Sequence, residues 1–278
     1  MSFLKSKLKE DSSMQKVPIS RIDLSTKMLD YKKDIVAEEA PLHIFLNQTH
    51  YVTILCTPSQ LKELAVGHLL SEGLLKSTDE IREVSLESGG KCTVRLKPHV
   101  NVEKQIAMAQ PFARLIVSAC GSTDYWPLTK LMDRLNLPQI STDSKVKAKI
   151  LLESVKQLNK LAEIFRKTGG VHVAAIYSRE GQLIVLAEDV GRHNAIDKVI
   201  GECALKSVDF KNCFVALSGR LTGDIVLKAA RMQIQTVISM AAAINSGIEV
   251  AKRTRITLVG FARGHRMNVY TNTERITF

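Results

Sequence analysis

Glu188-Asp-Val-Gly-Arg-His-Asn-Ala-Ile-Asp-Lys198 is the most informative stretch of the sequence, because polar side chains are crowded there between two apolar patterns. It follows the apolar run 183–187, which predicts a buried strand, and it continues into an amphipathic pattern that predicts a helix. Ligands of α/β sheets bind beyond the carboxyl ends of strands, and helix N-termini attract anions. The stretch therefore predicts an anion site. The alternative is a surface loop in which Asn194 caps the helix.

Around this stretch, the second half of the chain alternates between short apolar runs and amphipathic segments. An amphipathic helix is predicted over about 145–167, and Gly169-Gly170 ends it. Such alternation predicts an α/β domain over residues 145–278, with a mostly parallel sheet covered by helices on both faces. The predicted strands span 172–177, 183–187, 213–217, 236–239, 256–261 and 267–271.

The first half predicts a smaller α+β domain over residues 21–118, preceded by a polar tail over 1–20. A cysteine-containing loop and linker is expected over 119–144. The predicted strands span 42–46, 51–55, 81–87, 91–97 and 114–118.

A helix is predicted between the second and third of these strands, from about residue 58 to Gly73. Thr57 is expected to be its N-cap, Pro58 its first residue and Gln60 the partner that closes a capping box.

Composition limits the partners of the protein. A net charge of +11 over 278 residues favours an anionic partner, such as a nucleotide, nucleic acid or acidic protein surface. Aromatic residues make up only 5% of the chain, which disfavours nucleic-acid binding by stacking. An odd number of cysteines, five, and no apolar signal or membrane-spanning run predict a cytoplasmic protein that does not associate with membranes.

Four polar clusters lie where the predicted strands begin or end: 168–172, 189–197, 218–220 and 260–266. Their glycines let backbone approach a ligand closely, and their arginines can fork onto phosphate oxygens. Alone, each has a simpler explanation: a charged hairpin turn for 260–266, or a hydrogen-bonded core histidine for His172. Together they predict one anionic pocket.

Cys120 is the candidate nucleophile, because it precedes the flexible sequence Gly121-Ser-Thr-Asp124. The alternative, a small residue that merely ends a strand, is left open. Cys56, Cys92, Cys203 and Cys213 lie in apolar surroundings and are interpreted as structural. No cysteines or histidines have zinc-ligand spacing, so no metal site is expected.

Several long motifs resemble the formate dehydrogenase accessory sulfurtransferase (FdhD) family over about 38–276. In the first half they are Glu38-Glu-Ala-Pro-Leu42, Thr57-Pro58 and Glu63-Leu-Ala-Val-Gly-His-Leu-Leu-Ser-Glu-Gly73. In the second half they are the clusters at 168–172, 188–198 and 218–220, and Thr257-Leu-Val-Gly-Phe-Ala-Arg-Gly-His-Arg-Met-Asn-Val-Tyr270.

The resemblance implies a cytidine-deaminase-like, three-layer α/β/α C-terminal domain without zinc, a smaller α+β N-terminal domain, and a homodimer. It implies that a cysteine desulfurase loads persulfide sulfur onto the loop cysteine, here Cys120. The sulfur then passes to the molybdenum or tungsten of a bis-guanine-dinucleotide pterin cofactor, bound as substrate, for formate dehydrogenase. Neither nucleic acid nor membrane is an expected partner.

The segment from Phe261 to Arg266 falls at the cofactor-binding stretch of the family, and a guanine nucleotide is expected to mimic the cofactor. Asp189 and Asp197 are expected to orient the cations or to bind guanine and ribose. The full set of predicted contacts is Gly170, His172, Asp189, Arg192, His193, Asn194, Asp197, Ser218, Gly219, Arg220, Phe261, Ala262, Arg263, Gly264, His265 and Arg266.

The chain departs from the family pattern in three places. The family loop reads Cys-Gly-x-Cys, whereas Thr123 replaces the second cysteine here, so no relay between two loop thiols is possible. One persulfide still suffices for transfer; the alternative is a cofactor-binding chaperone without sulfur chemistry. Ala243 and Ile244 replace a usual Pro-Thr, and Asp224 replaces a usual glutamate.

Overall fold

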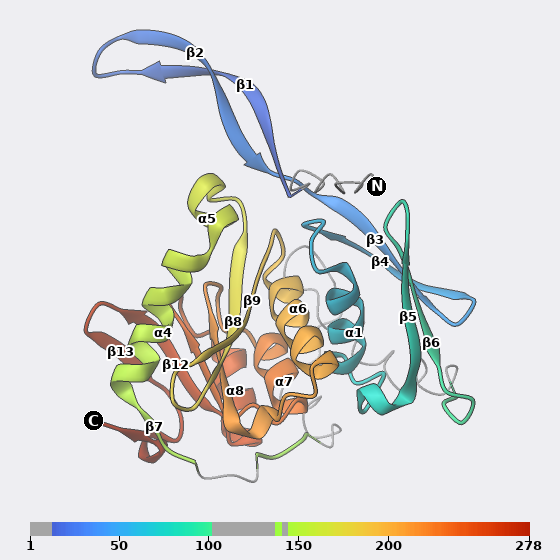
Figure 1. Ribbon diagram of the computed structural model, residues 1–278. Coiled ribbons are helices and arrows are strands. Elements are labelled where there is room, and N and C mark those ends of the chain that lie inside the picture. Colours follow the sequence, from blue (N-terminus) through green and yellow to red (C-terminus); the bar gives the residue numbers. More distant parts are fainter. Residues whose placement is uncertain (1–12, 102–136, 141–143) are drawn as a thin grey trace, which may run out of the picture.

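The computed structural model describes residues 13–101, 137–140 and 144–278 (Figure 1). They form a six-stranded C-terminal sheet, a four-stranded N-terminal sheet, helices around and between the two, and a hairpin that projects from the body. Among these residues, no helix is both long and apolar enough to cross a membrane.

The C-terminal sheet contains all six strands that the sequence predicts. In sheet order they are β13 (Arg266–Val269), β12 (Thr257–Arg263), β11 (Thr236–Ser239), β10 (Cys213–Leu217), β8 (His172–Ser178) and β9 (Leu183–Asp189).

The prediction of a mostly parallel sheet is wrong. Only the β10–β11 and β11–β12 pairs are parallel, and the other three pairs are antiparallel. The reason is connection length: Gly264-His265 is all that separates β12 from β13, and residues 179–182 separate β8 from β9. Such short links form hairpins, because a parallel connection needs a long crossover.

Helices cover both faces of this sheet, as predicted. Two lie on one face, α4 (Ala148–Leu161) and α5 (Glu163–Thr168), and three on the other, α6 (Arg192–Leu205), α7 (Gly223–Arg231) and α8 (Asn245–Thr254). The single helix predicted over 145–167 is broken at Ala162, where the backbone is extended. The Glu188 carboxylate accepts hydrogen bonds from the N–H groups of Ile164 and Phe165, which starts the second helix. The likeness to cytidine deaminase stays a prediction.

The N-terminal sheet, in the order β4-β3-β6-β5, confirms the strands predicted between residues 42 and 97. They are β3 (Ala40–Leu46), β4 (Thr49–Cys56), β5 (Ile81–Glu87) and β6 (Lys91–Leu96). The predicted helix is α1 (Leu61–Ser71), but the predicted capping box is wrong. Gln60 donates to Glu202 instead, and Thr57 Oγ1 accepts from the Val190 N–H, so tertiary partners take both side chains.

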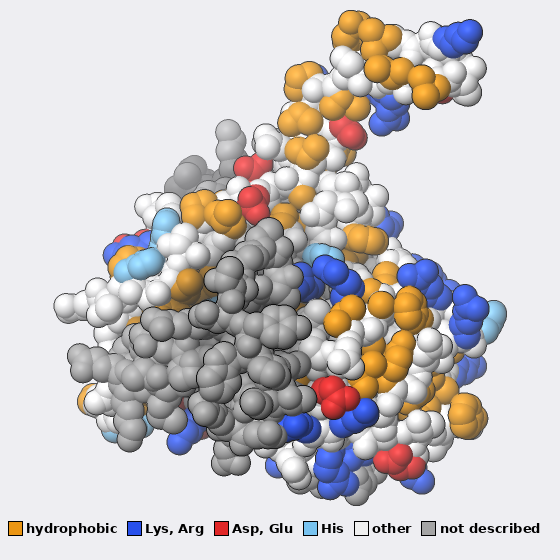
Figure 2. All heavy atoms as spheres, turned by 180° about the vertical axis from the view of Figure 1, so that it is seen from behind, with side chains coloured by type: hydrophobic (Ala, Val, Ile, Leu, Met, Phe, Trp, Pro, Cys, Tyr) orange, Lys and Arg blue, Asp and Glu red, His pale blue; other side chains and the backbone are white. Residues whose placement is uncertain are grey.

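The hairpin of β1 (Met14–Asp23) and β2 (Met28–Ala37) was not predicted from the sequence. Residues 14–20 belong to a strand of this hairpin, whereas the sequence analysis placed them in a polar tail. It projects from the body and carries apolar side chains on its surface (Figure 2). Leu24 and Tyr31 are 87% and 79% exposed. Without a buried face it has no clean polar–apolar alternation, which explains the miss. Short elements complete the described fold: β7 (Val146–Lys147), β14 (Ile276–Thr277), and the 3-10 turns η1 (Thr78–Glu80), η2 (Phe210–Asn212) and η3 (Thr273–Arg275).

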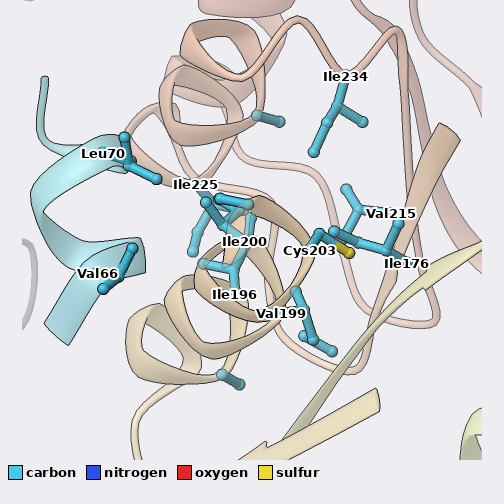
Figure 3. Close-up of a cluster of buried hydrophobic side chains, with 14 of the residues drawn as sticks. Val66, Leu70, Ile176, Ile196, Val199, Ile200, Cys203, Val215, Ile225 and Ile234 are labelled. Atoms are coloured by element: carbon cyan, nitrogen blue, oxygen red, sulfur yellow. The ribbon is translucent and has the colours of Figure 1, made fainter. Parts of the chain in front are cut away.

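Helix α1 joins the two sheets, because it packs between the N-terminal sheet and α6 (Figures 1 and 3). Val66 and Leu70 of α1 meet Ile196 and Ile200 of α6 in one continuous core. The domain boundaries stay a prediction. The strand predicted at 114–118 lies outside the described residues, as does most of the predicted loop and linker.

Candidate functional site

The four polar clusters meet at one edge of the C-terminal sheet, called the polar edge below. It comprises the start of β8, the ends of β9, β10 and β12, and the start of β13. Strand register brings them together: His172 pairs with Asp189, and Leu217 with Ala174. Because β10, β11 and β12 run parallel, their carboxyl ends lie on the same side.

A hollow of about 270 Å³ opens at the polar edge, lined by Phe165, Gly169, Gly170, Val171, His172, Val190, Ser218 and Met240. Beside it, a small void of about 10 Å³ lies among His172, Arg192, Gly219 and Arg220, enough for about one water molecule. The edge thus has space for part of a ligand, bordered by polar side chains and exposed glycine backbone.

Gly219 allows the residues around this void to approach one another. A Cβ atom at Gly219 would lie 3.1 Å from Arg192 Cβ and 3.4 Å from His172 Nδ1. Ser239, a residue that the sequence did not point to, holds the Gly219 segment, since its Oγ lies 2.6 Å from Gly219 O. A larger residue at position 219 would therefore displace Arg192 or His172.

The electrostatic setting of the polar edge is positive. Burial lowers the pKa of His172 below its ordinary value, and the neighbouring Arg192, His193 and Arg220 lower it further. His172 is therefore neutral at neutral pH, and its Nδ1 lies 3.4 Å from Ser218 Oγ. It can hydrogen-bond to a ligand, whereas the arginines supply the charge.

The turn between β12 and β13 carries the second group of cations. A bulge between Gly260 and Arg263 places Phe261 at φ 50° and 40% exposure. The Phe261 N–H donates to Ala241 O, and Arg263 Nε donates to the carbonyl of Met240, which lines the hollow.

The remaining members of the turn differ in exposure. Arg266 pairs with Arg263 across the two strands and is exposed, as are Gly264 and His265. Ala262 is fully buried in the core on the α4 side of the sheet, so its side chain does not reach the polar edge.

Three predicted contacts lie instead against the N-terminal part of the chain. Asp189 is fully buried, forms an ion pair with Lys198 at 2.7 Å, and accepts from the Thr57 N–H. Asn194 donates to Leu55 O and to Asp189, so the alternative in which Asn194 caps its helix is wrong. Gly191 occupies the N-cap position of α6.

Asp197 is the third predicted contact that lies against the N-terminal part of the chain. Its carboxylate meets Lys228 Nζ at 2.9 Å and Ser71 Oγ at 2.6 Å, with His68 at 3.2 Å. Burial alone would raise its pKa, but Lys228 and His68 outweigh burial and hold the pKa at about 2. The structure thus brings Arg192 and His193 to the polar edge and places Asp189, Asn194 and Asp197 in a buried contact with α1 and the segment before it.

Sequence reasoning missed the partners of this stretch. Lys228 and Ser71 donate to Asp197, and Lys228 also donates to Glu72; no local pattern pairs residues so far apart in the chain. Asp224 hydrogen-bonds to His193. Its position shortly after Ser218-Gly-Arg220, in the first turn of α7, was the one available signal.

The cysteines that the structure describes are buried, which confirms that they are structural. Burial raises the pKa of Cys56 and Cys203 to about 12, and that of Cys92 and Cys213 to about 11. These thiols are therefore poor nucleophiles. Cys120 lies outside the described residues.

Fold and site together define a mixed α/β protein whose sheet edge gathers cations and glycine backbone. The model of the FdhD/NarQ family matches residues 37–277, and the chain belongs to this family. It is 35% identical over 255 residues to the sulfur carrier protein FdhD of Bacillus pumilus, covering 88% of this chain and 92% of the relative. It is 32% identical to the protein of that name from Wolinella succinogenes, covering 96% and 90%.

A solved structure has the same fold. The crystal structure of a putative formate dehydrogenase accessory protein from Desulfotalea psychrophila matches with a TM-score of 0.76 and 28% identity. The match covers 95% of this chain and 99% of that one, so the arrangement of both sheets is shared.

Proposed function

We propose that this chain is a sulfur carrier for the maturation of formate dehydrogenase. Sulfur travels as a persulfide on Cys120 and passes to the metal of a bis-guanine-dinucleotide pterin cofactor, which binds as substrate. The observation that carries this proposal is the meeting of four glycine- and cation-bearing clusters at the polar edge. The relatives named sulfur carrier proteins support the sulfur chemistry.

The polar edge suits the dinucleotide tails of this substrate. Arg192 and Arg220 both line the small void, and guanidinium groups can fork onto phosphate oxygens. Arg263 and Arg266 extend the positive surface along the sheet. The hollow of about 270 Å³ is smaller than a typical site for a drug-sized ligand, so it accommodates one base or phosphate group and not the whole cofactor.

Sulfur loading needs one reactive thiol. The Cys120 thiolate attacks the outer sulfur of a persulfide on the cysteine desulfurase. A new S–S bond forms at Cys120, the bond to the desulfurase cysteine breaks, and that cysteine leaves as a thiolate. The four buried cysteines do not compete, because their raised pKa values keep them protonated. A second cysteine at position 123 is not required.

The proposed partners are a cysteine desulfurase, which donates the sulfur, and formate dehydrogenase, which receives the cofactor in the cytoplasm. A second copy of the chain completes the proposed homodimer. The exposed glycines and arginines at the polar edge leave it open to a large anionic substrate.

The sulfur step is tested by incubating the protein with a desulfurase and cysteine, then measuring its intact mass. We expect one added sulfur atom on the wild type and none on Cys120→Ala. The matched control, Cys213→Ala, removes a buried thiol and should still be labelled. An unlabelled wild type, or equal labelling of Cys120→Ala, would contradict the proposal.

A second candidate is a cofactor-binding chaperone without sulfur transfer, which the replacement of the second loop cysteine by Thr123 favours. The two candidates differ in the behaviour of Cys120→Ala in cells. A carrier predicts loss of formate dehydrogenase activity with cofactor binding intact, whereas a chaperone predicts that both survive.

A further inference from the structure

His193 and Asp224 form a pair at the polar edge. Asp224 lies in the first turn of α7, and its Oδ2 hydrogen-bonds to Nε2 of His193, in the first turn of α6. The Asp224 side chain is only 8% exposed, whereas that of His193 is 29% exposed. The pair therefore connects the cluster after β9 to the cluster after β10, with the histidine on the outer side.

The two ring nitrogens of His193 have different surroundings. Nε2 is hydrogen-bonded to Asp224, whereas Nδ1 has no hydrogen-bond partner among the residues that the structure describes. A carboxylate accepts a hydrogen bond only from a nitrogen that carries a proton, so Asp224 fixes a proton on Nε2 and orients the ring. When Nδ1 also carries a proton, Nδ1–H is available to an anion.

His172 provides an internal comparison, because it lies beside the same cations. Burial, Arg192, His193 and Arg220 all lower the pKa of His172, whereas Asp189 raises it. His193 differs because its ring is hydrogen-bonded to the Asp224 carboxylate. The partner carboxylate is thus what distinguishes the two histidines.

The Asp224 carboxylate is ionised over the neutral range. Burial would raise its pKa, but the hydrogen bond from His193 and the charge of that ring outweigh burial and lower the pKa below its ordinary value. The carboxylate is also shielded from solvent, so its attraction to His193 is screened little by salt.

We propose that Asp224 is a positioning residue, which holds the His193 ring so that Nδ1–H donates a hydrogen bond to a phosphate oxygen of the bound dinucleotide. This inference rests on the proposed function and specifies how one cation of the polar edge meets its ligand. Asp224 acts through His193 and does not touch the ligand.

Calorimetric titration with guanosine diphosphate tests the inference, using wild type, Asp224→Asn, Asp224→Glu and the surface control Glu249→Gln. We expect about tenfold weaker binding by Asp224→Asn, the loss of one charge-assisted hydrogen bond. Asp224→Glu keeps the carboxylate and should recover most of the affinity.

Nitrogen-15 spectra of the histidine rings separate positioning from binding. We expect His193, assigned with His193→Gln, to keep a proton on Nε2 in the wild type and to lose this preference in Asp224→Asn. Equal affinity in wild type and Asp224→Asn, or an unchanged ring spectrum, would overturn the positioning role alone. Failure of the wild type to bind the nucleotide would overturn the proposed function instead.

Discussion

Charged residues around the start of α6 lie on two sides of the helix and have different roles. On one side, Arg192 and His193 face the polar edge and are partly exposed. On the other, Asp189, Asp197 and Lys198 are buried and have protein partners for their charges. One polar stretch can therefore supply both a structural contact and a ligand site. Burial with satisfied hydrogen-bond partners distinguishes the structural contact from the ligand site.

The buried side exists because α1 and α6 lie unusually close. A Cβ atom at Gly67 would come within 1.7 Å of Asp197 O, and one at Gly201 within 1.8 Å of Glu63 O. The two helix backbones therefore touch at these glycines. The buried ion pairs of Asp189 with Lys198 and of Asp197 with Lys228 lie beside the apolar contact between the helices.

The largest effect is expected for Asp197→Ala, which leaves Lys228 buried with Glu72 as its remaining acidic partner. Removing one member of a buried ion pair costs about 4 kcal/mol of unfolding free energy. Urea unfolding measures this loss. The exposed pair of Glu153 and Lys156 supplies the control, because Glu153→Ala should cost well under about 1 kcal/mol. Equal losses would contradict the division of the stretch into two sides.

The next effect is expected for Gly201→Ala, in which the added methyl group meets the α1 backbone. Overpacking of this kind costs about 3 kcal/mol. The matched control is Gly170→Ala at the polar edge, where the nearest atom would lie 3.4 Å away. Denaturant unfolding should show little change for the control, and similar losses in both variants would disprove the close helix contact.

The pH dependence of stability should show a smaller contribution from Asp197. Its pKa is about 2 in the folded protein and 3.8 in the reference state, so its ionised form stabilises the fold above about pH 4. This contribution, about 2 kcal/mol, is lost as the pH falls from 4 towards 2. The stability difference between wild type and Asp197→Asn, measured by urea unfolding across this range, should therefore shrink. A constant difference would argue against the assigned ion pair.

The smallest effect is expected at Asn194, where two roles can be separated. Asn194→Ala removes the hydrogen bonds to Leu55 O and Asp189 and should cost about 1 kcal/mol. Asn194→Asp could still cap a helix, but it cannot donate to Leu55 O and adds a negative charge beside Asp189. Thermal unfolding should show that the aspartate variant is at least as unstable as the alanine variant. Full stability of Asn194→Asp would contradict the role of Asn194 as a donor and would support helix capping instead.

Much of the fold could be predicted from the sequence, because local patterns are strong where one face is buried. The strands of the C-terminal sheet and helix α1 followed directly from apolar periodicity. Strand direction did not follow from periodicity, because it depends on the length of the connections between strands. The short links at Gly264-His265 and at residues 179–182 were the signal in the sequence for antiparallel pairs. The β1–β2 hairpin has no buried face and therefore no pattern to detect.

The site was predictable only in part. The meeting of four clusters at one sheet edge followed from strand ends, and the structure places Arg192, Ser218 and Arg263 there. The buried role of Asp197 was not predictable, because its partners Ser71 and Lys228 lie far along the chain. Long-range ion pairs leave no local signature.

We propose that the polar edge binds the dinucleotide part of an anionic substrate. Calorimetric titration of guanosine diphosphate into wild type, Arg220→Ala and Asp197→Asn, with unfolding free energies measured in parallel, tests this binding. We expect Arg220→Ala to bind about tenfold more weakly with unchanged stability, because an exposed guanidinium is lost. Asp197→Asn should lose stability and, at temperatures where it is folded, keep its affinity. Unchanged affinity in Arg220→Ala, or no binding by the wild type, would contradict the claim.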